Sequence, residues 1–437
     1  MTQIAILLAT LLGVADLPAS VEPPTVEASA VQPVPTLTAS YDNRFLLQIP
    51  ASKFSLQPIL FLQTLFSLPR NAALAQSYEG MGFSFRRAGV GIDARVEEWG
   101  RVFFLANVAS GSMALWDFFS DIEILDEPGL LVFRAGRFRP WLCRQRLAAG
   151  DRFQMTQFPR VITDFLDIGD GRDLGMGAFG LYDSKLEYAA GIWNGEQNYQ
   201  QASTGKVGDR IMRGNLDFEV GGRIVYHPLG YLSAVDESDL AYSTAPRLAV
   251  GISAMYNRRH DQQLPNYDPT AGLSDAQRRV FVDDRVLKVG FEAAFRYEGL
   301  SIEAEAFLRK VWLAGSVGSD QFNSLGVGAL GRAAYLQSGY FLLPHKLEAT
   351  GRFEFVDVEP ASPGYMLHPT AGLNYFLHGY NLLLQFMYRA NVGVGFDSYD
   401  AYWRSAKPAL RYTTAPSLDR PLSRITHEIY FMLQASL

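Results

Sequence analysis

The chain has 437 residues, a formal net charge of -6 at pH 7 and a mean hydropathy of zero. No stretch after the N-terminus holds the roughly 18 uninterrupted apolar residues that a transmembrane helix requires, which argues against a helical membrane protein. The single cysteine, Cys143, excludes a disulfide framework within the chain, and we expect it to be a small buried thiol. The length suits either several globular domains or one large barrel.

Residues 1–15 have the features of an export signal. An apolar core, Ile4–Leu12, precedes the small residues Gly13–Ala15, although a basic n-region is missing. The alternative is a buried N-terminal helix. Residues 16–50 are predicted to be a Pro-rich periplasmic linker, because their first part is rich in Pro, Ser, Thr and Val and has no basic residue until position 44.

From residue 51 to the end, apolar and polar residues alternate over long segments. In Val286–Glu298, one face carries Leu287, Val289, Phe291, Ala293, Phe295 and Tyr297. A soluble sandwich also alternates, but its strands usually have about five or six residues. These segments are long enough to cross a bilayer at the tilt of a barrel strand. The pattern therefore predicts an all-β fold, a transmembrane antiparallel β-barrel over residues 51–437.

Sixteen such segments can be counted, an even number that suits a closed single-chain barrel. They lie near residues 53–66, 82–96, 101–109, 115–125, 130–139, 173–182, 185–193, 214–226, 246–257, 285–298, 300–312, 326–341, 345–358, 366–377, 381–393 and 423–437. Connections after even-numbered segments are short, as at Asp183–Ser184, and several after odd-numbered segments are long. This asymmetry is typical of outer-membrane barrels with both ends in the periplasm. The connection His227–Ala245 is the exception, because it is long on the short side.

The third long loop, at 139–172, is rich in arginine and has no regular pattern. Loops of this length inside a compact domain are usually functional or disordered. A structured loop needs a cavity to receive it. We therefore expect this loop to fold into the lumen of the barrel.

Several motifs follow one another along the chain: Gly82–Ala88, Trp116–Phe119, Gly136–Pro140, Gly171–Gly175, Gly191–Gly195 and Gly372–Asn381. In their order and spacing, the chain from about residue 53 to its end resembles the phosphate-selective porin O and P family. The resemblance implies a sixteen-stranded, trimeric outer-membrane porin. It also implies that anions pass along Arg and Lys side chains to a constriction formed partly by the third long loop.

The chemistry of the inward side chains also favours anion binding in part of the lumen. Guanidinium groups are permanently charged and match phosphate oxygens bidentately. The alternation on the second strand sends Arg87 inward, whereas Arg86 has the wrong parity unless a bulge resets it. Arg137 and Arg139 also have an outward parity, so placing them in the lumen requires an irregular chain near Gly136. A wall of salt-bridged arginines is the alternative.

On the fourth strand, alternation places Trp116, Phe118, Ile122 and Ile124 toward lipid, and Asp117, Asp121 and Glu123 inward. Such carboxylates either position arginines, temper anion binding, or form plain structural ion pairs. The net charge of -6 does not support a strongly basic phosphate trap. The candidate constriction consists of Arg86, Arg87, Asp121, Arg137, Arg139, Arg144 and Arg146.

Enzyme chemistry has little support in the sequence. The six histidines have no metal-ligand spacing, and no nucleophile stands near a base. The acidic residues between Asp164 and Asp173 lack the spacing of a calcium loop. We expect no catalysis, no metal and no cofactor.

The sequence therefore predicts an outer-membrane porin that allows passive diffusion of small solutes, with anions such as phosphate as candidate solutes. The main alternative is a structural or adhesive barrel whose pore is plugged by the loop at 139–172, and an outer-membrane enzyme comes third. Expected partners are outer-membrane lipid, two further copies in a homotrimer, and the barrel-assembly machinery, but not nucleic acid. That machinery recognises a final alternating strand, which here ends in Leu437 instead of the usual Phe.

Overall fold

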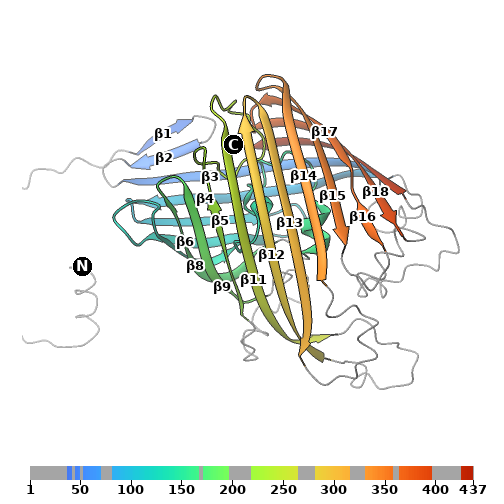
Figure 1. Ribbon diagram of the computed structural model, residues 1–437. Helices are drawn as coiled ribbons and strands as arrows, with labels where there is room; N and C mark the ends of the chain where they lie inside the picture. Colours follow the sequence, from blue (N-terminus) through green and yellow to red (C-terminus); the bar gives the residue numbers. More distant parts are fainter. Residues whose placement is uncertain are drawn as a thin grey trace, which may run out of the picture. The chain divides into compact units, whose positions relative to one another are not determined.

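The computed structural model describes residues 37–41, 45–49, 53–69, 81–166, 171–195, 218–263, 281–314, 330–357, 364–395 and 425–436. All of them belong to one unit, Leu37–Leu437. They form a single nineteen-stranded antiparallel sheet that closes on itself (Figure 1). Among these residues no helix is long and apolar enough to cross a membrane, a finding that does not bear on crossing by strands.

Neighbouring strands of the barrel follow one another in the sequence. The first half contains β3 (Phe54–Pro69), β4 (Gly82–Val96), β5 (Gly100–Asn107), β6 (Ala114–Glu123), β7 (Val132–Phe138), β8 (Asp173–Tyr182), β9 (Leu186–Trp193) and β10 (Glu219–Tyr226). The second half contains β11 (Arg247–Gln263), β12 (Phe281–Tyr297), β13 (Leu300–Ala314), β14 (Leu330–Leu343), β15 (Leu347–Asp357), β16 (Tyr365–Leu367), β17 (Thr370–His378), β18 (Leu382–Val394) and β19 (Ile425–Ser436). Pairing of β19 with β3 closes the barrel.

The barrel has sixteen strand positions, as the sequence predicted. β16 and β17 share one position, because both pair with β15 on one side and β18 on the other. The break between them is at Pro369, which has no N–H to donate to a neighbouring strand. The two remaining strands, β1 (Thr38–Tyr41) and β2 (Phe45–Ile49), form a hairpin outside the barrel.

That hairpin changes one detail of the predicted domain boundaries. β2 pairs with Phe54–Leu56 of β3, next to the part of β3 that pairs with β19. The predicted linker 16–50 therefore includes two strands that extend the sheet. The rest of the linker and the predicted signal, residues 1–15, lie outside the described residues.

The barrel wall separates apolar from polar side chains by strict alternation. On β12, Lys288, Glu292 and Arg296 face the interior and are buried, whereas Phe291 between them faces outward and is 47% exposed. The outward residues of the other strands are mostly Leu, Val, Ile and Phe. A continuous apolar belt of this kind is the surface that lipid covers in a transmembrane barrel. The charged residues on the inner face do not contact this lipid, because the strands separate them from it.

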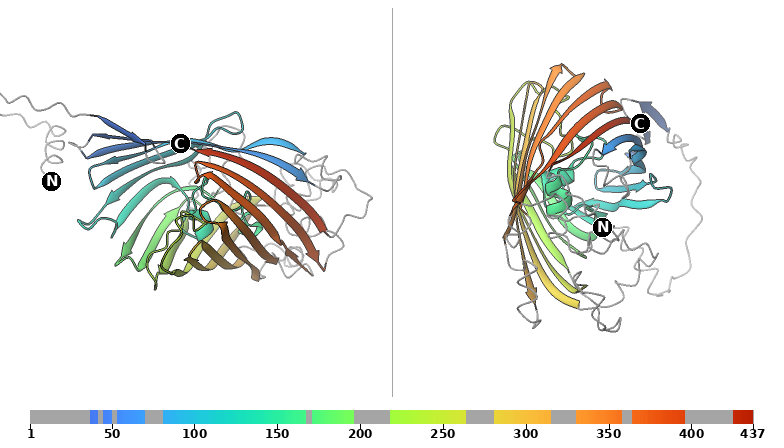
Figure 2. Two further views of the ribbon diagram at one scale, coloured as in Figure 1. Left: turned by 90° about the horizontal axis from the view of Figure 1, so that it is seen from above. Right: turned by 90° about the vertical axis from the view of Figure 1, so that its right-hand side faces the viewer.

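The third loop lies inside the barrel, as predicted. Its two helical turns, α2 (Arg144–Leu147) and η2 (Val161–Phe165), lie within the ring of strands in Figure 2. They belong to an apolar cluster that joins the loop to facing walls, with Trp141, Leu142 and Phe165 on the loop and Trp193, Phe307 and Tyr335 on strands. The main hydrophobic core of the protein therefore lies between the loop and the wall.

The connection His227–Ala245 also folds inward, which explains why it is long. Ser238 donates to Glu348 of β15 at 2.9 Å, and Gln337 of β14 donates to Glu237 at 3.0 Å. Arg296 of β12 donates to the carbonyl oxygen of Asp236. Shorter connections join the other strand pairs on this side, for example the tight turn at Asp183–Lys185. We call residues 227–245 the inner connection.

Candidate pore constriction

A β-bulge in β4 turns two adjacent arginines into the lumen. The register pairs Arg87 with Gln63 and Phe85 with Thr64 of β3, so Arg86 is an extra residue. Arg86 Nε donates to the carbonyl oxygen of Thr156 in the third loop at 3.3 Å. The sequence required such a bulge for Arg86 to face inward, and the structure contains it.

Arg87 is 7% exposed and is held without a carboxylate. Its Nη1 donates to Gln63 Oε1 at 2.8 Å, and its guanidinium lies 4.9 Å and 5.3 Å from the ring centres of Phe153 and Phe158. Among the described residues, no carboxylate lies within ion-pair distance of it. Arg87 also experiences the like charges of Arg86, Arg139 and Arg172, and more weakly the opposite charge of Glu237 in the inner connection. Positive charge is therefore concentrated around Arg87.

Arg139 and Arg172 reach this cluster from the two ends of the third loop. Arg139 Nη1 donates to the carbonyl oxygens of Arg146 and Ala148, each at 2.6 Å. Arg172 Nε donates to Asp117 Oδ2 at 2.8 Å, and its guanidinium lies 4.7 Å from the ring centre of Trp116. Arg172 was missing from the candidate residues, although it belongs to the motif Gly171–Gly175. We call Arg86, Arg87, Arg139 and Arg172 the arginine cluster.

Arg137 does not belong to the cluster. It pairs with Phe118 on one side and Leu174 on the other, and both of these side chains are exposed on the outer face. Arg137 Nε donates to the carbonyl oxygen of Leu115 at 3.2 Å. Although Gly136 has a φ of 134°, alternation continues to Phe138, so Arg137 points outward. Only after Phe138 does the chain turn into the lumen, which brings Arg139 inside.

Asp121 binds wall arginines. It accepts hydrogen bonds from Arg134 at 2.6 and 2.8 Å, and from Arg101 at 3.4 Å. Arg101 is also paired with Asp93 at 2.8 Å. This group matches the structural ion pairs that the sequence left open as an alternative.

Trp116 was expected to face lipid, and this expectation is wrong. A register shift between β5 and β6 pairs Leu105 with Asp117 and Ala106 with Leu115, so Trp116 is an extra residue. It is buried, and its ring centre lies 6.3 Å from that of Phe61. Alternation alone cannot reveal such a shift, because one added residue exchanges the two faces of a strand.

Arg144 and Arg146 anchor the third loop. Arg144 is 1% exposed, forms a 3.0 Å ion pair with Glu303 of β13, and donates to the carbonyl oxygens of Leu232 and Ser233 in the inner connection. Arg146 donates to the carbonyl oxygen of Gly171 at the end of the loop. The neighbouring Cys143 is buried, and burial raises the pKa of its thiol, as expected for an unreactive cysteine.

Amide side chains on adjacent strands hold the middle of the loop. They donate to loop carbonyls between residues 150 and 154: Gln63 to Gly150 at 2.9 Å, Gln434 to Asp151 at 2.8 Å, Gln385 to Phe153 at 3.0 Å and Asn374 to Gln154 at 2.8 Å. We call these four residues the amide ladder. Charge patterns in the sequence do not reveal these residues, because all four side chains are neutral.

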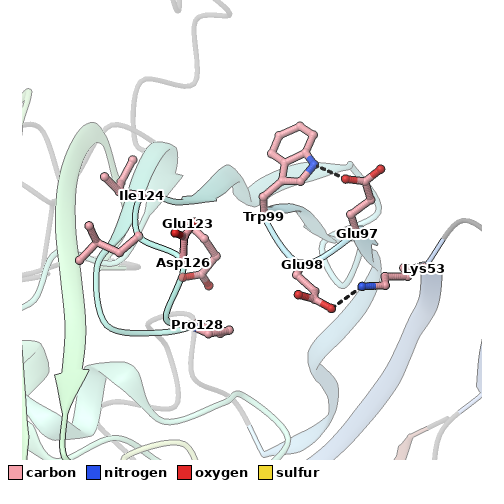
Figure 3. Close-up of a pocket in the computed structure, with 9 residues that line it drawn as sticks. Lys53, Glu97, Glu98, Trp99, Glu123, Ile124, Asp126 and Pro128 are labelled. Atoms are coloured by element: carbon pink, nitrogen blue, oxygen red, sulfur yellow. Dashed lines mark hydrogen bonds and ion pairs between the residues drawn. The ribbon is translucent and has the colours of Figure 1, made fainter. Parts of the chain in front are cut away.

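A pocket of about 660 Å³ lies where the turns after β4 and β6 meet, on the side of the short turns (Figure 3). Its charged lining residues are mostly acidic and include Glu97, Glu123 and Asp126. Lys53 is paired with Glu98 at 2.6 Å, and the Trp99 indole donates to Glu97 at 2.9 Å. The sign of charge therefore differs between this pocket and the arginine cluster.

No protein-family model matches the sequence, and no curated protein sequence matches it. Solved structures of outer-membrane proteins do match it in fold. A trimer form of OmpT from Vibrio cholerae has a TM-score of 0.55 at 9% identity, over 88% of this chain and 99% of that one. An anion-selective porin from Comamonas acidovorans has a TM-score of 0.53 at 8% identity, over 88% and 100%. OprB from Pseudomonas putida has a TM-score of 0.52 at 9% identity, over 87% and 94%.

Similarity at this level of identity concerns the fold. The chain has the fold of outer-membrane β-barrel proteins, as the sequence predicted.

Proposed function

We propose that the protein is an outer-membrane diffusion channel for small solutes and that it favours anions such as phosphate. The arginine cluster is the observation that carries this proposal, because Arg87 has no carboxylate partner among the described residues. Fixed charges act strongly in a narrow, partly desolvated passage. Solutes would cross down their gradients, and we expect no catalysed reaction.

Planar-bilayer recording tests this function. The refolded protein should conduct, and its reversal potential in a KCl gradient should lie on the anion-selective side. Arg87→Gln keeps most of the side-chain volume and should shift the reversal potential toward cations. Arg332→Gln is a matched control, because Arg332 lies on the exposed outer face and pairs with Asp357. Equal behaviour of the two variants would argue against an anion site at Arg87.

A plugged structural barrel is the second candidate. The third loop and the inner connection are bonded to each other and to several strands of the wall. A loop that plugs the barrel permanently would be expected to form many such hydrogen bonds to the wall. A protein that is correctly folded and inserted, yet does not conduct, would favour this candidate.

We also propose a homotrimer related to the phosphate-selective porin O and P family. One structural neighbour is described as a trimer form, and the motifs carry the family resemblance. Arg137 on the outer face fits better at a contact between copies than against lipid, where a charge is costly. Electrophoresis of unheated and heated samples should show a complex that dissociates to the mass of one chain.

We propose that residues 1–15 are removed on export and that the following residues, up to the hairpin, remain as a periplasmic linker. The Pro-rich composition of 16–36 supports this assignment. N-terminal sequencing of protein isolated from outer membranes should find Asp16 first.

A further inference from the structure

We propose that Gln63 sets the ion preference of the passage, because it holds Arg87 with a neutral acceptor and no carboxylate among the described residues contacts this arginine. This inference rests on the proposed channel function. It assigns a role in selectivity to a neutral residue of β3.

Several other inward arginines are held by carboxylates. Among them are Arg101 with Asp93 at 2.8 Å, Arg134 with Asp121 at 2.6 Å, Arg172 with Asp117 at 2.8 Å, Arg223 with Glu292 at 2.6 Å and Arg352 with Glu354 at 2.8 Å. In each of these pairs, the negative charge of the carboxylate largely cancels the electric field of the arginine at a distance. Arg87 differs because its hydrogen-bond partner, Gln63, has no charge.

The surroundings of Gln63 require an amide. Its carbonyl oxygen accepts from Arg87, and its Nε2 donates to the carbonyl oxygen of Gly150 at 2.9 Å and to Gln434 Oε1 at 2.7 Å. Arg87 can only donate, and the carbonyl oxygen of Gly150 can only accept, so the orientation of the amide is determined. Gln63 is 1% exposed, so water does not replace these partners.

A carboxylate at position 63 would change the passage without changing its size. In Gln63→Glu, the new carboxylate would form a charge-assisted pair with Arg87. It would also face two acceptors, at Gly150 and Gln434, with nothing to donate. We expect the ratio of anion to cation permeability to fall about tenfold, which corresponds to about 1.4 kcal/mol of lost attraction.

Asn391→Asp is the matched control. Asn391 faces the lumen from β18, is buried and bonds to His368 and Thr426, away from the arginine cluster. The substitution makes the same amide-to-acid change and adds the same charge to the wall. It should keep most of the wild-type permeability ratio.

A second pair of variants, at Gly150, changes the charge beside Arg87 and leaves Gln63 intact. The test therefore does not depend on whether Gln63→Glu folds. A Cβ atom built on Gly150 lies 3.7 Å from Arg87 Cδ and has only ordinary contacts. Gly150→Asp should therefore place a carboxylate beside Arg87 while Gln63 stays intact. Gly150→Asn is its neutral match, and the difference between the two variants reports the added charge.

The measurements are reversal potentials in a KCl gradient and calorimetric binding of inorganic phosphate to the detergent-refolded protein, which does not require an open passage. Gln63→Glu and Gly150→Asp should each lose selectivity and phosphate affinity relative to their controls. If Asn391→Asp loses as much as Gln63→Glu, or if both carboxylate variants keep the wild-type values, the inference is wrong. A wild-type protein that neither prefers anions nor binds phosphate would instead overturn the proposed function itself.

Discussion

The backbone N–H of Ala149 in the third loop donates to the carbonyl oxygen of Val235 in the inner connection at 3.0 Å. Side chains strengthen this junction, because Gln145 donates to Glu237 and the backbone N–H of Gln154 donates to Glu237 at 2.8 Å. The lumen is thus occupied by two segments that enter from opposite ends of the barrel. The inner connection supports the third loop from the side of the short turns.

Removal of the inner connection should widen the passage. Replacing residues 228–248 with Asn-Gly would join His227 to Ala249, which the register of β10 and β11 places opposite each other. We expect a larger single-channel conductance and a noisier open state, because the third loop would lose its support. Shortening Leu125–Pro128, at the rim of the acidic pocket, is a control that should leave the conductance nearly unchanged. An unchanged conductance in the first variant would show that the inner connection does not limit flow.

The buried pair of Arg144 and Glu303 should contribute strongly to the docking of the loop. Their side chains are 1% and 4% exposed. Arg144→Ala leaves the buried carboxylate of Glu303 with only Arg296, at 3.6 Å, and breaking a buried pair typically costs about 3–5 kcal/mol. Urea unfolding followed by tryptophan fluorescence should show the loss, since Trp141 lies in the same cluster. Replacing both partners, as Arg144→Met with Glu303→Leu, should recover much of it, and failure to do so would indicate that other contacts hold the loop.

Contact between the loop and the inner connection should weaken as pH rises. Burial, together with the charge of Glu303, raises the pKa of Glu237 above its ordinary 4.5. The docked state therefore binds the proton more tightly than the undocked state, and docking loses stability as pH increases above about 4.5 toward the raised value. Protection factors for hydrogen exchange in residues 139–166, which correct for the pH dependence of intrinsic exchange, should be lower at pH 8 than at pH 5.5. Glu237→Gln should remove most of this difference, whereas Glu98→Gln at the exposed rim should retain it.

The outward position of Phe291 gives a direct test of the membrane belt. Phe291→Arg should destabilise the barrel in lipid by about 2–4 kcal/mol if it lies near the middle of the bilayer. Leu342→Arg, at the turn-side end of β14, should cost no more than about 1 kcal/mol, because charge is tolerated near the interface. Reversible unfolding of both variants in lipid vesicles would measure the difference. If the two substitutions lower the free energy of unfolding equally, Phe291 does not lie nearer the middle of the bilayer than Leu342.

Much of the fold follows from local pattern. Each strand needs only its own alternation to show which side chains meet lipid, so the sequence alone determined sixteen strand positions, their faces and the side of the short turns. Val286–Glu298 is the clearest case, since its outward positions from Leu287 to Tyr297 are all apolar and its charged residues Lys288, Glu292 and Arg296 face inward. The inward course of the third loop also followed from its length and the presence of a lumen.

What only the tertiary structure decided depends on single residues that shift register and on contacts between distant segments. The bulges at Arg86 and Trp116 bring both side chains inside, and alternation cannot place an extra residue. Arg137 lies on the outer face and Arg139 lies in the lumen, because the chain turns inward only after Phe138. Gln63 and Arg87 are register partners on the adjacent strands β3 and β4, but the bulge at Arg86 sets that register, and alternation in the sequence does not show which inward side chains it pairs.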